Sequence, residues 1–358
     1  MVLYENWWDV SSHNNQDYFF SRFFEAACAD WEGLQHTDIA VCSVFGSPHV
    51  LAQPSHKKVR IFFVGENLNI MHQHFRQNFD ATTDIQLGFT NFFGSSKFMY
   101  FPLYLIYWDF WSQGLFSAQS NENRNDKAVI VANHSAGGLR TAICQKVAEC
   151  GVKIDGNREV VYPQFDALIA MGGSCTDKRE KIAEYKYNIC PENSIAPGYT
   201  TEKLFESFYS GCIPIYWGAP CIMNIIRPQY FVNLSEETLE SKLSVVKQPE
   251  GLHFWNENAL QILFYKYAVL WVKVWQLLKA KHTTTVNVTV KNDNVLKVMY
   301  KVQSYRDAIY ALYEHWNKYN HLFIPRAQFM IQRENNKQME WEEIIEKVEQ
   351  DPGLALVH

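Results

Sequence analysis

Short apolar runs alternate with amphipathic helical stretches along the chain, and this alternation limits the fold more than any other feature of the sequence. It predicts strands at residues 2–4, 39–45 and 59–64 and a helix at residues 16–28, whose apolar side chains recur at helical spacing. Strands that alternate with helices are typical of α/β units with parallel strands. We therefore expect a parallel sheet in the first half of the chain.

A second series of the same kind follows a polar stretch at residues 117–126, which is the best candidate for a linker. Two α/β halves joined near residue 120 predict a double-Rossmann arrangement, and a length of 358 residues also favours two domains. In the second series we expect strands at 128–132, 187–190 and 213–217 and helices at 138–150 and 201–210.

Beyond about residue 236 the chain is predominantly helical, with segments near 254–281, 299–319 and 335–350. The sequence leaves open whether these helices pack back across the first domain. We predict an N-terminal Rossmann-like domain over 1–120, a C-terminal Rossmann-like domain over 127–330 and a helical tail over 331–358.

Charge and cysteine spacing exclude several classes of protein. A net charge of −5 and an isoelectric point near 6.2 exclude general affinity for nucleic acid, which requires a basic face. The eight cysteines form no Cys-x-x-Cys pair, so zinc and thioredoxin-type sites are not expected, and free thiols in a reducing cytoplasm are the simplest interpretation. The first ten residues contain acids and no basic region, and no stretch is apolar enough to span a bilayer. We therefore expect neither a secretory signal nor a membrane anchor in this sequence.

Aromatic residues make up 15% of the chain and include eleven tryptophans. Several lie beside polar residues in expected loops, as Trp7 and Trp8 do, and such placement is typical of sugar-binding clefts. Aromatic side chains also fill cores and interfaces, and composition alone favours that explanation.

Two cations are expected in the first turn of a helix, where the helix dipole opposes positive charge. Arg140 follows the glycines that end residues 133–138. Lys203 follows Thr200 and Thr201, either of which can cap the helix. Backbone N–H groups at a helix start and a cationic side chain together suit an anion, so both helices are candidates to bind a diphosphate. The alternative is that both cations are solvated and paired with neighbouring carboxylates.

The chain lacks the motifs of other nucleotide-binding classes. It contains no Walker loop and no Gly-x-Gly-x-x-Gly fingerprint after a strand, so kinase and dehydrogenase functions lose their usual support. It also contains no Asp-x-Asp pair that could bridge a metal ion to a nucleotide diphosphate. Side-chain cations would then have to stabilise a departing diphosphate.

A long, spaced motif carries a resemblance to a known family. It reads YKYNICPENS at 185–194, GYTTEK at 198–203 and PIYWG at 214–218, and it resembles the signature of the α-1,3/4-fucosyltransferases of glycosyltransferase family 10, bacterial type. The resemblance extends back through VGEN at 64–67 and NWW at 6–8, and so covers roughly the first two-thirds of the chain. It implies the GT-B fold, in which two Rossmann-like domains face a cleft, with GDP-β-L-fucose as donor and inversion at the anomeric carbon.

The resemblance also implies roles for individual residues. Glu66, just beyond an expected strand, matches the general base, and Glu202 matches a second carboxylate that holds fucose hydroxyls or supports developing positive charge. Each has a plainer alternative, namely a turn carboxylate for Glu66 and a helix-start carboxylate for Glu202. The donor-binding matches are Arg140, Lys178, Asn193, Tyr199, Glu202 and Lys203, the acceptor-binding matches are Trp7, Trp8 and Asp9, and no metal ligand is implied.

The resemblance implies the activity of an inverting α-1,3-fucosyltransferase. Such an enzyme moves L-fucose from GDP-β-L-fucose to O3 of GlcNAc in N-acetyllactosamine-type glycans. The products are Lewis-type structures. Two alternatives keep the donor and move the bond to O4 of GlcNAc or to O3 of the glucose of lactose. A third, a non-catalytic glycan-binding protein on the same fold, is disfavoured because Glu66 and Lys203 are both present. No cofactor is expected to be required, and stimulation by Mn²⁺ or Mg²⁺ is left open. The expected setting is the bacterial cytoplasm, with weak peripheral association with the membrane left open.

Overall fold

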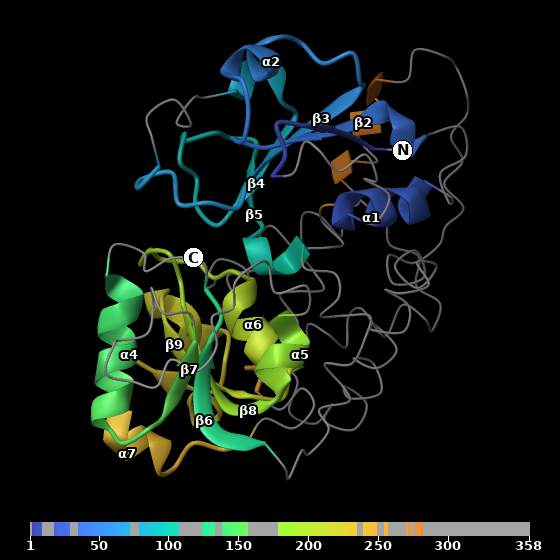
Figure 1. Cartoon of the computed structure of the whole chain (residues 1–358). Helices are drawn as coiled ribbons and strands as arrows, with labels where there is room; N and C mark the ends of the chain where they lie inside the picture. The colour runs from blue at the N-terminus through green and yellow to red at the C-terminus, as the bar shows by residue number, and fades with distance from the viewer. Residues whose placement is uncertain are drawn as a thin grey trace. The chain divides into compact units, whose positions relative to one another are not determined.

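The chain divides into two compact units in this computed structural model (Figure 1). The first unit comprises Met1–Ser112 and Glu257–His358, and the second comprises Gln113–Asn256. The structure describes residues 2–8, 18–28, 35–71, 79–106, 124–132, 138–156, 178–234, 239–248 and 254–256, together with Leu270, Lys273, Val274, Leu277, Leu278, Ala280 and Lys281.

The described strands of the first unit form a five-stranded parallel sheet in which the strands follow one another in chain order. The strands are β1 (Leu3–Glu5), β2 (Ile39–Cys42), β3 (Val59–Val64), β4 (Ile85–Gly88) and β5 (Phe98–Tyr100). Among the described residues before Ser112, the helices of this unit are α1 (Phe19–Cys28), α2 (Pro48–Ala52) and the 3₁₀ helices η2 (His36–Asp38), η4 (Asp80–Thr82) and η5 (Leu103–Ile106).

Strand β3 is buried along its whole length because both faces of the sheet are covered. On one face Phe62 packs in a cluster with Leu51 of α2 and with Phe79. On the other face Phe63 meets Phe20 of α1 with ring centroids 5.8 Å apart. Burial on both faces is why this strand reads as a continuous apolar run in the sequence.

The described strands of the second unit also form a five-stranded parallel sheet, in the order β10-β9-β8-β6-β7. The strands are β6 (Asn125–Ile130), β7 (Ile154–Gly156), β8 (Tyr185–Pro191), β9 (Ile213–Trp217) and β10 (Val232–Asn233). The helices are α4 (Leu139–Glu149), α5 (Lys178–Ala183), α6 (Glu202–Tyr209), α7 (Leu239–Leu243) and the 3₁₀ helices η6 (Pro220–Asn224) and η7 (Pro228–Tyr230).

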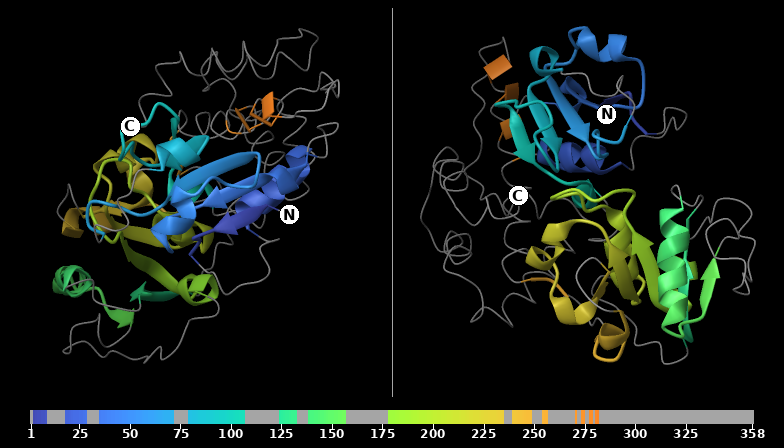
Figure 2. Two further views of the ribbon diagram at one scale, coloured as in Figure 1. Left: turned by 90° about the horizontal axis from the view of Figure 1, so that it is seen from above. Right: turned by 90° about the vertical axis from the view of Figure 1, so that its left-hand side faces the viewer.

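Helices cover both faces of this second sheet, and the side chains of β6 alternate between them. Ile130 packs with Ile143 and Val147 of α4, which runs alongside the strands in Figure 2. Val129 points the other way and packs with Ile182 of α5. The second unit is therefore a three-layer α/β structure, as Figure 1 shows with α4 and α5 on opposite sides of the strands.

The strand order of the second unit contains a reversal. Its first strand in the chain, β6, lies between the second, β7, and the third, β8. The crossover that follows β6 therefore runs to β7 on one side, and the crossover that follows β8 runs to β9 on the other. Ligands of open α/β sheets bind at such a switch point, beyond the carboxyl ends of the strands.

The α/β prediction is confirmed, and the strands predicted at 59–64 and 213–217 match β3 and β9 in both bounds. The predicted helices at 138–150 and 201–210 match α4 and α6 to within one residue at each end. The prediction missed the short strands β4, β5, β7 and β10.

The second unit ends at Asn256, earlier than the predicted residue 330. The contacts of the described helical residues between 270 and 281 explain the difference. Leu270, Val274 and Leu278 are buried at a spacing of four residues, and the Lys281 ammonium pairs with the Asp84 carboxylate of the first unit. The predicted helices at 299–319 and 335–350 and the tail over 331–358 lie outside the described residues. Within the described part of the chain, no helix is both long and apolar enough to cross a membrane.

Candidate functional site

A pocket opens at the switch point of the second sheet. Its walls come from the ends of the two strands that flank the reversal, and three cations from three helices reach it. The lining residues are Ile130, Val131 and Ala132 after β6, Asn188, Ile189, Cys190 and Pro191 of β8, Arg140 of α4, Lys178 of α5 and Lys203 of α6.

Two of these cations occupy the helix-start positions that the sequence predicts. Arg140 is the second residue of α4 and Lys203 the second residue of α6. Gly138, at a φ of 91°, turns the chain into α4 in a conformation that favours glycine. The prediction of two first-turn cations is therefore confirmed, and the structure brings both of them to one pocket together with Lys178.

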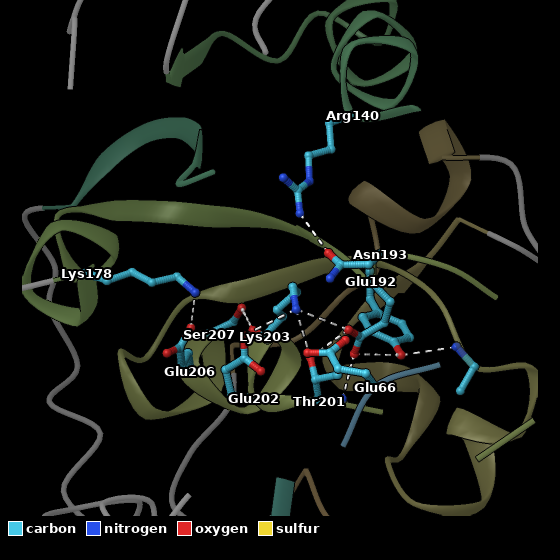
Figure 3. A network of polar contacts seen from close by, with 12 residues as sticks. Glu66, Arg140, Lys178, Glu192, Asn193, Thr201, Glu202, Lys203, Glu206 and Ser207 are labelled. Carbon is cyan, nitrogen blue, oxygen red and sulfur yellow. Dashed lines mark hydrogen bonds and ion pairs between the residues drawn. The ribbon is translucent and has the colours of Figure 1, made fainter. Parts of the chain in front are cut away.

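Each pocket cation is paired with an oxygen of the protein (Figure 3). Arg140 Nη2 donates to Asn193 Oδ1 at 2.9 Å, and the Lys178 ammonium pairs with the Glu206 carboxylate. Lys203 Nζ lies 3.3 Å from an oxygen of Glu202. Burial lowers the pKa of Arg140, and the negative charges of nearby carboxylates oppose this shift.

Glu192 is a functional candidate that the sequence analysis did not single out. Its carboxylate is fully buried, and Oε2 lies 3.5 Å from Lys203 Nζ. Thr201 donates to it twice, from the backbone N–H at 2.8 Å and from the hydroxyl at 2.6 Å. Tyr216 adds a hydroxyl contact at 3.4 Å. The residue lies inside the quoted motif, but its partners are 9 to 24 residues away along the chain, so local spacing gives no signal for them.

Thr201 occupies the N-cap position of α6, as predicted, but its side chain makes no capping hydrogen bond. The hydroxyl donates to Glu192 instead, and the Lys203 ammonium donates to the same hydroxyl at 3.1 Å. The oxygen of Thr201, one of the two candidate caps, thus accepts from the Lys203 ammonium and not from a backbone N–H of α6, so Thr201 provides no side-chain cap.

The remaining donor-binding predictions differ in their placement. Asn193 is exposed and accepts the hydrogen bond from Arg140. Glu202 is half-buried beside Lys203. Tyr199 is only 1% exposed and does not line the pocket, so the structure places it in the core next to the motif turn.

Glu66 and the tryptophans belong to the first unit. Glu66 lies two residues beyond the end of β3, as predicted, and the Trp8 indole N–H points at its Oε1 with an N···O distance of 3.4 Å. Trp7 is 6% exposed and packs against Tyr4, Phe20 and Phe63, so it offers almost no surface to an acceptor sugar. The acceptor role of Trp7 stays a prediction, and Asp9 lies outside the described residues.

Metal-ligand side chains do not cluster in the described part of the chain: no group of three or more His, Cys, Asp or Glu residues there could hold a metal ion. The charged groups at the pocket are instead cations paired with carboxylates or an amide. Such a set suits an anionic ligand, because each cation can exchange its protein partner for a ligand oxygen.

Comparisons with known proteins point to one family. Residues 121–250 match the model of glycosyltransferase family 10 (fucosyltransferase), C-terminal part. A stretch of 66 residues is 39% identical to the α-(1,3)-fucosyltransferase FucT of Helicobacter pylori, covering 18% of this chain and 14% of that protein. A stretch of 55 residues is 34% identical to an α-(1,4)-fucosyltransferase of Arabidopsis thaliana, covering 15% of this chain and 14% of that protein. The matched stretches thus span about a seventh of the length of each of these two relatives.

Among solved structures, this chain is similar to a crystal structure of an α1,3-fucosyltransferase with GDP-fucose. The two share 17% sequence identity with a TM-score of 0.46, and the match covers 85% of this chain and 89% of that chain. The match to the family model spans β6 to α7 and so contains the pocket and its three cations. Residues 121–250 are thus similar to the C-terminal part of glycosyltransferase family 10, the fucosyltransferases.

Proposed function

We propose that this chain is an inverting α-1,3-fucosyltransferase that moves L-fucose from GDP-β-L-fucose to O3 of GlcNAc in N-acetyllactosamine-type glycans. One observation carries the proposal: the family-matched unit brings Arg140, Lys178 and Lys203 to one pocket at the switch point of its sheet. A nucleotide diphosphate is the part of the donor that needs several cations, and this part of an α/β sheet is where nucleotides bind.

In the proposed reaction the acceptor hydroxyl attacks C1 of fucose from the face opposite GDP. The new bond joins C1 to the acceptor oxygen, and the bond from C1 to the β-phosphate oxygen breaks with its electron pair going to GDP. Arg140, Lys178 and Lys203 stabilise the charge that develops on the diphosphate. Glu202 has a lowered pKa, because the Lys203 and Lys178 charges outweigh the effect of burial, and its ionised carboxylate is suited to support positive charge on the fucosyl ring.

The acceptor hydroxyl must lose its proton during the attack, and we assign this step to Glu66 as general base. One oxygen of the Glu66 carboxylate accepts the Trp8 indole N–H, which orients the group. Its position just beyond the end of a central parallel strand is one where α/β sheets place functional side chains.

The bond that is formed decides between this proposal and its alternatives. The Arabidopsis thaliana relative is an α-(1,4)-fucosyltransferase, so transfer to O4 of GlcNAc is the second candidate. We would incubate the chain with GDP-fucose and type 1, type 2 and lactose acceptors and locate the new linkage by NMR. Fucose at O3 of GlcNAc on type 2 chains supports the proposal, and fucose at O4 or on lactose alone selects an alternative. Glycan binding without any transfer would indicate a non-catalytic protein.

The donor assignment has a separate test. Lys203→Met and Arg140→Met should each weaken GDP binding about tenfold or more, since a hydrogen bond to a charged group contributes about 1.5–3 kcal/mol. Calorimetry of GDP binding measures this directly. Unchanged affinity in both variants would place the diphosphate elsewhere.

We also propose a cytoplasmic setting, with weak peripheral membrane association left open. Cys42, Cys144, Cys190 and Cys212 are buried free thiols, which are typical of reducing compartments. Fractionation of cells that express the chain tests this setting, and recovery from a secreted fraction would contradict it.

A further inference from the structure

Two of the pocket cations, Lys178 and Lys203, pair with carboxylates of the protein, and the pair of Lys203 with Glu192 is the most buried of these contacts. The Lys203 side chain is 18% exposed and the Glu192 side chain 0%. Glu202 also lies near the Lys203 ammonium, but its side chain is 15% exposed to solvent. Glu192 has no exposed surface, so the loss of Lys203 as a partner costs it more than it costs Glu202.

Glu192 is held in place from three directions. The Thr201 backbone and hydroxyl bind both of its oxygens, and the Tyr216 hydroxyl contacts one of them. Gly218 closes the remaining side, since a Cβ there would lie 2.6 Å from Glu192 Cγ and 2.3 Å from the Tyr216 hydroxyl. The carboxylate therefore cannot follow Lys203 toward a ligand.

This fixed carboxylate creates a conflict at Lys203. If the ammonium turns toward a diphosphate, a fully buried carboxylate loses its nearest counter-ion, and an unpaired buried charge is costly. We propose that Glu192 competes with the donor's diphosphate for Lys203, so that it weakens the binding of GDP and speeds its release. The inference rests on the proposed function, because it requires the diphosphate to bind Lys203.

The groups that face Glu192 allow this competition. Lys203 and Glu202 face it from α6, Arg140 from α4, and Tyr216 from β9, with Cys190 next to it on β8. Burial raises the pKa of Glu192, and the Lys203 charge opposes that shift. The carboxylate thus depends on Lys203 for its charged state.

The test compares GDP binding by the whole chain and its Glu192→Gln variant, which keeps the shape of the side chain and removes its charge. Calorimetry gives Kd, and displacement of a fluorescent GDP derivative in stopped flow gives koff. We expect GDP to bind about three- to tenfold more tightly to the variant, chiefly through a slower koff, as for the loss of one partly screened charge contact. Weaker or unchanged binding would overturn the proposal and leave Glu192 as a residue that only positions Lys203 or supports the fold.

A double-mutant cycle with Lys203→Met identifies the route of the effect. The tightening caused by Glu192→Gln should disappear when Lys203 is already replaced, whereas a general packing effect would persist. If Lys203→Met leaves GDP binding unchanged while Arg140→Met weakens it, this inference fails. If neither variant weakens GDP binding, the proposed donor site fails as well.

Asp155→Asn is the matched control, because it also converts a buried carboxylate of the second unit to an amide. Asp155 accepts from the Tyr185 hydroxyl, pairs with Lys127 and does not line the pocket, so its variant should bind GDP within about twofold of the parent. Thermal unfolding confirms that each variant is folded.

If Glu192→Gln does not fold, Glu192→Asp is the second variant. Its shorter side chain draws the carboxylate away from Lys203, so GDP should again bind more tightly than to the parent. Weaker binding to Glu192→Asp would equally overturn the proposal.

Discussion

Three carboxylates near the start of α6 differ in how burial and neighbouring charge act on them. Burial raises the pKa of Glu192 and of Glu206, and in each case a lysine opposes the shift only in part. Burial also acts to raise the pKa of Glu202, but the charges of Lys203 and Lys178 more than offset it, so the pKa is lowered. Glu202 is therefore the carboxylate of this group that is most firmly ionised and best suited to a cationic transition state.

The residues of the site were predictable to different degrees. Arg140 and Lys203 stood out because a cation in the first turn of a helix opposes the dipole, and this conflict is visible in local sequence. Glu192 gave no such signal, since its role depends on contacts between β8, β9 and α6 that form only in the folded unit. The burial of Trp7 could not be predicted, because its polar neighbours suggest a loop, while the fold packs its ring against Phe20 and Phe63.

Replacing Glu66 by Gln tests the proposed base. General-base catalysis contributes about 10²–10⁴-fold, so kcat should fall by at least about a hundredfold, while calorimetric GDP affinity stays within about twofold. Glu202→Gln provides the contrast, because a carboxylate beside Lys203 should affect both GDP-fucose binding and rate. If Glu66→Gln retains most of its kcat, the proton goes to another group and Glu202 is the next to examine.

Trp8 makes two contributions that separate variants can distinguish. Trp8→Phe keeps an aromatic face and removes the N–H that points at Glu66, so kcat should fall a few-fold, as expected for one hydrogen bond, with acceptor KM little changed. Trp8→Ala also removes the ring and should raise acceptor KM more than donor KM. Steady-state kinetics with each substrate varied in turn measures both effects. A larger effect on donor KM in Trp8→Ala would show that this ring does not serve the acceptor.

At the scale of elements, the strand ends determine what the second sheet can bind. The end of β6 and the end of β8 lie on either side of the reversal, and the helices that follow them, α4 and α6, each deliver one cation. Both helices were predicted well because glycine precedes α4 and threonine precedes α6, and the apolar residues of α6 lie on one face. Strands β7 and β10 have only three and two residues, too few for a periodic pattern, so pairing with their neighbours and not local sequence defines them.

The carboxylates around the start of α6 predict how GDP binding depends on pH. A bound diphosphate adds negative charge near Glu192 and Glu206, whose pKa values burial already raises, and so favours their protonated forms. The complex therefore holds more protons than the free protein, and GDP affinity should rise as pH falls through the range in which these carboxylates take up a proton, at pH values above the phosphate's own titration near 6. Calorimetry across this range tests the sign. The dependence should be shallower in Glu192→Gln, and affinity that falls over the same range would contradict the argument.

At the scale of the whole molecule, the two sheets have the same number of described strands but different orders. The described strands of the first unit run in chain order without a reversal, whereas the second unit has one, which is why we assign the nucleotide to the second unit. The sequence predicted two α/β units because both show alternating strands and helices. It could not show that residues after Glu257 group with the first unit, because that depends on docking contacts such as the pair of Lys281 with Asp84.

This organisation bears on whether the reaction needs a metal ion. The sequence has no Asp-x-Asp pair to bridge a metal to a diphosphate, while three fixed cations already line the pocket of the family-matched unit. Three positive side chains can neutralise the charge of departing GDP without a divalent ion, so turnover should persist in excess EDTA. Added Mn²⁺ or Mg²⁺ should raise the turnover rate only modestly, by screening released GDP.

The measurement is transfer to a type 2 acceptor before and after chelation, with Lys203→Met as the matched variant. That variant has one cation fewer and should gain more from added Mg²⁺ than the parent does. Complete loss of activity with EDTA, restored by metal, would show that the side-chain cations are insufficient and that the donor reaches its transition state with a metal ion bound.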